Sequence, residues 1–261
     1  MNYSSDLEYI VGGSYSPGSY GNVSYFLKNT DDNYGFAGES HIHIEPAYQR
    51  KAPKIQYPNQ QQYALIHYDE PHSFTPEILL NPSRPKSRFI DDNNEAKAIA
   101  EEIFELMMKE PFPSDISINI LPFEEFKILH SRFGAWSNGI LGFSLNGTVK
   151  KIFVRENHLD SLMMVIGHEI GHVFTNTLPN KHDEEAKAFA FSIEWAGAIR
   201  KHNVSNLGLS IKDDIDLEPA RNGLHDIAFS FVDFMVKKGR SAMQLHDDLA
   251  KRYASIFNLF Y

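Results

Sequence analysis

The chain has 261 residues, with 25 lysine and arginine residues against 34 aspartate and glutamate residues, and a formal net charge of −9. It contains no cysteine, which excludes disulfides, thiolate metal ligands and a cysteine nucleophile, so any metal site must be built from histidine and carboxylate. The acidic balance and the lack of a dense basic run argue against a nucleic-acid partner. The unusual feature of the composition is the presence of 12 histidines.

The sequence also bears on localisation. The first 30 residues carry neither a basic start nor an apolar run, and no stretch approaches about 18 consecutive apolar residues. We therefore expect no membrane segment and a cytoplasmic location, while secretion by a route that uses no such signal stays open. Nothing in the composition indicates an oligomeric state.

Residues 1–90 are rich in Tyr, Gly, Ser, Asn and Pro, with short alternating runs between turn residues, and this predicts a β-rich N-terminal region of unknown role. His41, His43 and Glu45 alternate along one of these runs, so they form either a second metal site or an exposed polar strand face. The composition changes near residues 85–92, which separates this region from a second domain over residues 91–261.

The second domain begins with regular elements. Apolar residues recur at helical spacing over residues 94–109, and two prolines end that helix. Residues 116–121 then predict a short buried strand, and residues 123–133 predict a short helix that ends at Gly134.

A hairpin and a series of helices follow. Apolar runs at residues 140–145 and 149–154 flank Asn146-Gly147, a strong hairpin signal. An amphipathic helix is then expected from Asn157, a plausible cap, to about Thr175. The remaining helices are expected over residues 184–202, 222–238 (closed by Gly239) and 241–259.

The first long helix of this series carries a candidate metal site, His168-Glu169-Ile170-Gly171-His172. Histidines at positions i and i+4 lie over one another on one helix face, so both imidazoles can reach one metal ion. Glu169 is turned by about 100° from His168, which makes it the candidate general base rather than a ligand. A catalytic zinc ion takes three protein ligands and keeps a position for water, so a third ligand is needed.

Four carboxylates on the next helix are candidates for that ligand. With Lys187 as the centre of the polar face and about 100° per residue, Asp183, Glu184 and Glu194 fall within about 60° of it. Glu185 falls about 160° away, beside apolar residues, and a buried carboxylate is compensated when it binds a metal. We therefore expect Glu185 to be the third ligand; its other interpretation is a first-turn glutamate favoured by the helix dipole.

These residues resemble a known family. The segment from His168 to Phe174, together with Asp183-Glu184-Glu185-Ala186-Lys187-Ala188-Phe189-Ala190, resembles the zincin metallopeptidases of the gluzincin type, and within them the ImmA/IrrE group. The resemblance covers roughly residues 140–200. Alignment on Ala186 and Phe189 places Asp183 at the ligand position of the family, whereas alignment on its Glu-x-x-Ala spacing selects Glu185.

The resemblance implies an α+β, zincin-like catalytic domain: a small sheet with an edge strand, an active-site helix and a helical C-terminal part. It places Lys151–Arg155 where the family has its edge strand, so the strand near 149–155 is expected to hold an extended substrate. It also implies one zinc ion held by His168, His172 and a carboxylate as the third ligand. The oxyanion donor is left open among His225, Arg221 and Tyr253.

The sequence therefore predicts a zinc-dependent endopeptidase of limited specificity towards a protein or peptide substrate. In the implied reaction Glu169 takes a proton from the attacking water and returns it to the leaving amine. The alternative is a zinc-stabilised regulatory or binding module without proteolytic activity, and a protein side chain in the fourth metal position would favour it.

Overall fold

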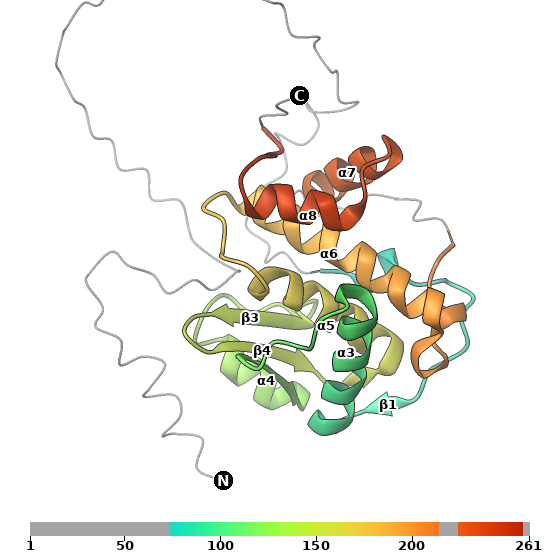
Figure 1. Cartoon of the computed structure of the whole chain (residues 1–261). Helices are drawn as coiled ribbons and strands as arrows, with labels where there is room; N and C mark the ends of the chain where they lie inside the picture. The colour runs from blue at the N-terminus through green and yellow to red at the C-terminus, as the bar shows by residue number, and fades with distance from the viewer. Residues whose placement is uncertain (1–73, 214–223, 258–261) are drawn as a thin grey trace, which may run out of the picture. The chain divides into compact units, whose positions relative to one another are not determined.

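The structure, a computed structural model, describes residues 74–213 and 224–257 (Figure 1). Over these ranges the fold is mixed α+β, with six α-helices, a three-stranded sheet and a two-stranded sheet. In chain order the elements are η1 (Pro76–Ile78), β1 (Phe89–Ile90), α3 (Asn93–Met108), β2 (Ile116–Leu121), α4 (Phe123–His130), β3 (Gly142–Asn146), β4 (Lys150–Arg155), β5 (Asn157–His158), α5 (Leu159–Val173), α6 (Lys181–His202), η2 (Val204–Asn206), η3 (Gly208–Ser210), α7 (Leu224–Lys237) and α8 (Ala242–Ala250). The expected β-rich segment before residue 74, with His41, His43 and Glu45, lies outside the described residues.

The three-stranded sheet has the order β2-β4-β3, so β4 is its central strand. Strand β4 runs parallel to β2 and antiparallel to β3, and Ile152 lies opposite Ile118 on one side and opposite Ser144 on the other. The expectation that Lys151–Arg155 is the edge strand is therefore wrong, because both sides of β4 are already paired. The edge strand that packs against α5 is β3.

The two faces of this sheet contribute to different cores, as the alternation of side chains along a strand requires. Ile118, Ile120 and Ile152 face the main core, to which α3 and α5 also contribute. Phe143 faces the other way and packs with Phe126 of α4 in a smaller apolar cluster. The sheet thus lies between α4 and the layer that contains α5.

Helix α6 is the centre of the C-terminal part, since it packs against α5, α7, α8 and α3 (Figure 1). It begins at Lys181, earlier than expected, because the Asn180 side chain caps it by accepting from His182 N and Asp183 N. Helix α8 ends at Ala250 rather than near residue 259. Gly239, at φ 92°, follows α7 as expected.

The segment before α3 belongs to the same packed unit. Phe74, Leu79, Leu80 and Ile90 are buried in the main core. Leu80 also forms an antiparallel bridge with Ile211, and β1 pairs with β5 just before α5. Residues 74–90 therefore pack with the helices and the sheet of the second predicted domain.

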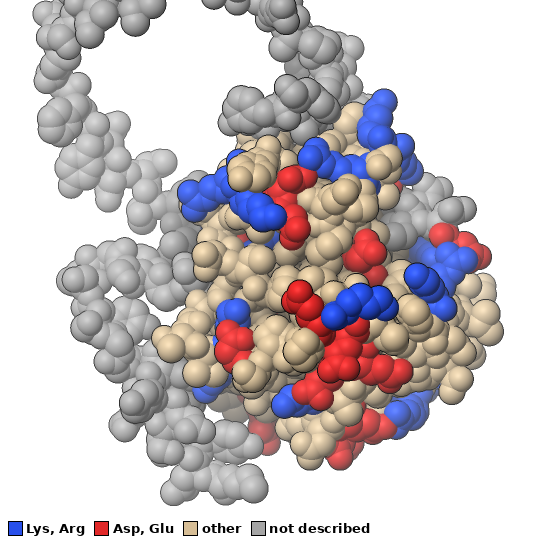
Figure 2. Space-filling model, viewed as in Figure 1, with Lys and Arg blue, Asp and Glu red and all other residues tan. Residues whose placement is uncertain are grey.

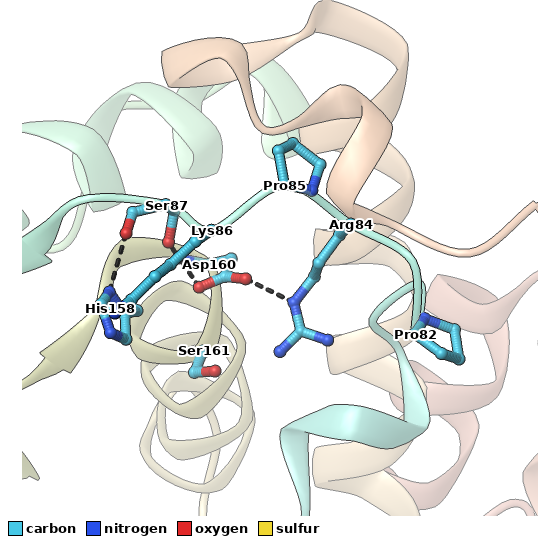
Figure 3. Close-up of a pocket in the computed structure, with 8 residues that line it drawn as sticks. All are labelled: Pro82, Arg84, Pro85, Lys86, Ser87, His158, Asp160 and Ser161. Atoms are coloured by element: carbon cyan, nitrogen blue, oxygen red, sulfur yellow. Dashed lines mark hydrogen bonds and ion pairs between the residues drawn. The ribbon is translucent and has the colours of Figure 1, made fainter.

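This segment is fastened to the start of α5 (Figure 3). Arg84 Nε donates to Asp160 Oδ2 and Ser87 Oγ donates to Asp160 Oδ1, each over 2.5 Å, beside a small pocket. Ser87 Oγ also accepts from Asp160 N, and His158 is the N-cap residue of the helix in place of Asn157. The first turn of α5 is thus held from outside the helix.

Helix α3 is polar on the face that meets solvent. Glu102 and Glu105 lie on the exposed side of α3, and Figure 2 shows acidic side chains gathered over this helix. No helix in the described part of the chain is both long enough and apolar enough to cross a membrane.

Candidate metal centre

Helix α5 carries both motif histidines on the face that meets α6. Their Nε2 atoms lie 3.2 Å apart, and the two rings meet edge to face. Each of His168, Glu169, His172 and Glu185 is at most 1% exposed. The i, i+4 spacing thus brings two ring nitrogens to one point inside the protein, as predicted.

Two glycines on α5 allow α6 to come close. A Cβ atom at Gly171 would lie 2.8 Å from Ala188 Cα, and one at Gly167 would lie 2.5 Å from the Trp195 ring. Trp195 uses that space to donate from Nε1 to Met163 O over 2.9 Å. The glycines at i and i+4 therefore set the short separation of the two helices at the histidines.

This close approach places Glu185 of α6 against the histidines. Glu185 Oε2 lies 3.4 Å from His168 Nε2 and 3.8 Å from His172 Nε2. A tetrahedral zinc ion with bonds of about 2.0–2.1 Å sets its ligand atoms about 3.3–3.4 Å apart. The three atoms, separated by 3.2 to 3.8 Å, thus form a triangle of the size that such an ion requires.

The outer ring nitrogens fix which nitrogen faces the site. Ser192 Oγ donates its proton to Ala188 O over 2.8 Å, so at 3.3 Å it accepts from His168 Nδ1. His172 Nδ1 lies 2.9 Å from Glu184 Oε1, which also requires a proton on Nδ1. With both rings neutral, the two Nε2 atoms direct their lone pairs at each other and at Glu185, an arrangement that suits a cation between them.

Burial and neighbouring charges shift the pKa values of the ionisable groups at the site in different directions. Burial lowers the pKa of His168 to about 4, so this imidazole is neutral. For Glu185, burial is outweighed by His225 and His172, and its pKa is well below the usual value. For His172, burial opposes the charge, but Glu185 and Glu184 raise its pKa. The site thus combines a neutral histidine with an ionised carboxylate.

Glu169 lies on the side of the site that faces β3. Burial raises its pKa to about 7, and Ser144 of β3 hydrogen-bonds to its carboxyl group. A Cβ atom at Gly142 would lie 3.1 Å from Glu169 Oε1, so the glycine leaves room for this side chain. A carboxyl group with a pKa near neutrality suits a general acid and base.

One side of strand β3 faces away from β4 and lies next to Glu169. Arg155 N donates to Leu141 O, so the antiparallel alternation directs the backbone groups of Phe143 and Leu145 at β4. The backbone N–H and C=O groups of Gly142 and Ser144 therefore point away from β4, on a side where the described residues place no further strand.

The other carboxylates considered as ligands lie elsewhere. Asp183 accepts from Ser255 Oγ over 2.8 Å and from Ile256 N over 2.7 Å, so it fastens the C-terminal segment. Glu184 contacts the outer nitrogen of His172, and Glu194 is half-buried further along α6. The geometry therefore favours Glu185 over Asp183 at the ligand position.

The structure describes two of the three candidate oxyanion donors, and only one of these two lies at the site. His225, on α7, places Nε2 3.0 Å from Glu185 Oε2. Tyr253 is 68% exposed and takes no part in the buried cluster. Arg221 lies outside the described residues. Among the donors that the structure describes, His225 is the one at the site.

The prediction that Lys187 and Glu184 lie on or beside a solvated face of α6 is wrong. Lys187, taken as its centre, has no exposed surface, and Glu184 is 4% exposed. Lys187 Nζ donates to Glu184 Oε2 over 3.0 Å, so the two charges are buried as a pair. Sequence reasoning also missed Ser144, Ser192 and Phe74, which no local pattern connects with the motif.

Comparisons of the chain with protein-family models, with curated proteins and with solved structures give no match. The likeness to the ImmA/IrrE group therefore rests on the motif residues, and the function has to be inferred from the site itself.

Proposed function

We propose that this protein is a zinc-dependent endopeptidase of limited specificity that hydrolyses a peptide bond in a protein or peptide substrate. The observation that carries the proposal is the convergence of His168 Nε2, His172 Nε2 and Glu185 Oε2 within 3.8 Å, with Glu169 buried beside them. A structural zinc site has no need of an additional carboxyl group of this kind next to its ligands.

The donor set fits zinc, and His168, His172 and Glu185 are the residues that would hold the ion. When bound, the ion supplies Lewis-acid polarisation of the substrate carbonyl and lowers the pKa of the attacking water. Glu169 accepts the proton of that water and returns it to the leaving amine. Its pKa of about 7 suits both transfers at neutral pH.

The substrate peptide binds beside the general base, at the side of β3 that faces away from β4, where Ser144 hydrogen-bonds to Glu169. His225 is the candidate donor to the oxyanion, since it already contacts Glu185.

The substitution Glu169→Gln tests the proposal. It removes the proton acceptor but keeps the size of the side chain, so peptide hydrolysis should fall by at least about 100-fold. Zinc content, measured by atomic emission after gel filtration, should stay near one ion per chain. The matched control is Glu194→Gln, a half-buried glutamate further along α6, which should leave both quantities unchanged. Cleavage that persists in Glu169→Gln would exclude this mechanism.

One contact supports a second candidate function, a zinc-stabilised regulatory or binding module without proteolytic activity. His225 lies against Glu185, and a histidine that completes the metal coordination would occupy the place of the catalytic water. X-ray absorption of the zinc-loaded protein separates the two. In the endopeptidase the zinc ion should have two histidine ligands and keep both in His225→Ala, whereas in the module it should lose one of three histidine ligands in that variant.

A further inference from the structure

Lys187 is a fully buried lysine on α6, two residues after Glu185. A lysine without solvent is costly unless its charge is compensated, and an apolar side chain of similar size fills such a place more cheaply. Here the compensation comes from Glu184, which accepts from Lys187 Nζ over 3.0 Å. The buried pair lies directly behind His172.

Glu184 links this pair to the metal centre. Its Oε1 atom lies 2.9 Å from His172 Nδ1, while Oε2 accepts from Leu178 N over 2.7 Å and from Lys187. A carboxylate on the outer nitrogen of a histidine fixes its tautomer and makes the inner nitrogen a stronger ligand. Both oxygens of Glu184 are thus engaged, and Lys187 provides one of the donors that set its orientation.

Lys187 also holds the backbone of the same histidine. Its Nζ atom donates to His172 O over 3.2 Å and to Asn176 O over 3.1 Å. Helix α5 ends at Val173, so carbonyl groups of its last turn have no partner within the helix. Asn146 of β3 complements this contact by donating to Thr175 O over 2.9 Å. His172 is therefore fixed through both its ring and its main chain.

The two motif histidines differ in this respect. The outer nitrogen of His168 meets a neutral hydroxyl group, Ser192 Oγ, at 3.3 Å. The outer nitrogen of His172 meets a carboxylate that is itself paired with a buried ammonium group. His172 is therefore the histidine of the pair whose outer nitrogen has a charged hydrogen-bond partner.

We propose that Lys187 is a positioning residue of the metal centre, which acts through Glu184 to hold His172 in the orientation that binds zinc. This inference rests on the metal site of the proposed function but not on the peptidase reaction. Without Lys187, Glu184 Oε2 keeps only Leu178 N as a donor, whereas His172 O keeps Asn146 Nδ2 as a donor at 3.4 Å. The carboxylate then turns away from His172 Nδ1, and zinc binds more weakly.

A double-mutant cycle on zinc affinity tests this inference in the full-length protein. The dissociation constant for zinc is measured by competition with a chromophoric chelator in the wild type, Glu184→Gln, Lys187→Met and the double variant. Each single substitution should weaken zinc binding by about 10-fold to 100-fold. Because Lys187 acts through Glu184, the double variant should stay within about threefold of Glu184→Gln.

Trp195→Phe is the matched control. It removes a buried hydrogen bond between the same two helices, from Trp195 Nε1 to Met163 O, without touching a histidine ligand. Its zinc dissociation constant should remain within about threefold of the wild-type value. A loss of affinity that merely reflects looser packing of α5 on α6 would appear in this variant as well.

The outcomes separate this inference from the proposed function. Unchanged or tighter zinc binding by Lys187→Met, or a double variant whose loss is the product of the two single losses, overturns the role of Lys187. If Lys187→Met does not fold, the comparison of Glu184→Gln with the charge-balanced double variant decides, since equal affinities support the inference and unequal ones overturn it. A wild type that binds no zinc refutes both proposals, whereas zinc binding without proteolysis refutes only the peptidase.

Discussion

The ring of Phe74 lies flat against the imidazole of His168, with ring centroids 4.2 Å apart and 9° between the ring planes. Phe74 also contacts Phe189 of α6 and is itself only 4% exposed. It precedes η1 and is followed by the bridge from Leu80 to Ile211, so it reaches the site from a segment that belongs to neither α5 nor α6. An apolar ring thus covers one face of a candidate ligand.

We expect Phe74→Leu to release zinc faster. Loss of the flat ring removes a shield over His168, so a chelator such as EDTA should strip the metal several-fold faster than from the wild type. The measurement is the rate of zinc transfer to a chromophoric chelator under excess chelator. Leu80→Val, in the same segment but in contact with the apolar core, should cost about 0.5–1.5 kcal/mol of stability without changing that rate. Equal rates in Phe74→Leu and the wild type would contradict a shielding role.

The third ligand is open to a direct test. Glu185→Ala should bring zinc content close to zero, because two histidines alone do not form a catalytic zinc site. Asp183→Ala should keep one ion per chain, since Asp183 bonds to Ser255 and Ile256 instead. Limited proteolysis should then show a more readily cut C-terminal segment in Asp183→Ala. Zinc retained by Glu185→Ala would refute the assignment.

Local sequence patterns predicted the elements well where one helix or strand decides its own limits. The strand at residues 116–121 has the predicted bounds, and α3 begins at Asn93 because the Asp92 side chain caps it. The inward direction of Glu185 also followed from helical spacing. The strand order did not, because pairing across β2, β4 and β3 depends on contacts between distant segments.

The side chains that surround the metal centre could not be predicted from the sequence, for a related reason. A helical wheel assumes that one face of the helix meets water, but α6 is packed by α5, α7, α8 and α3. Lys187 and Glu184 could therefore be buried against each other, although helical spacing predicted that both are solvated. Phe74 lies more than 90 positions from His168 along the chain, and nothing in its own neighbourhood indicates the contact.

Gly171 offers a test of how helix packing supports the site. In Gly171→Ala the new Cβ atom would lie 2.8 Å from Ala188 Cα, so α5 and α6 must move apart. We expect a loss of about 1–3 kcal/mol in the free energy of unfolding and weaker zinc binding, since Glu185 moves away with α6. Gly197→Ala is the matched control on α6, because nothing lies within 4 Å of its Cβ position. It should stabilise the protein by up to about 1 kcal/mol and leave zinc affinity unchanged. Chemical denaturation measures the free energy of unfolding, and chelator competition measures the zinc affinity. A Gly171→Ala variant with unchanged stability and zinc affinity would refute this account of the packing.

Asp160, at the start of α5, predicts a pH-dependent part of the stability. Burial opposes its charge, but hydrogen bonds from Ser87 and Arg84 prevail and lower its pKa in the folded protein. A carboxylate with a lowered folded-state pKa stabilises the fold above its unfolded pKa, about 3.9, and this contribution disappears as the pH falls through the folded value. Asp160→Asn cannot ionise, so it should be less stable than the wild type by about 1.5–3 kcal/mol at pH 6, and the difference should shrink steadily towards pH 3.

Urea denaturation of both proteins after removal of metal by a chelator measures the difference at each pH. Glu101→Gln, which removes an exposed partner of Lys97 on α3, should change stability by only a few tenths of a kcal/mol at every pH. A difference for Asp160→Asn that does not vary with pH would mean that the ionised carboxylate does not fasten α5.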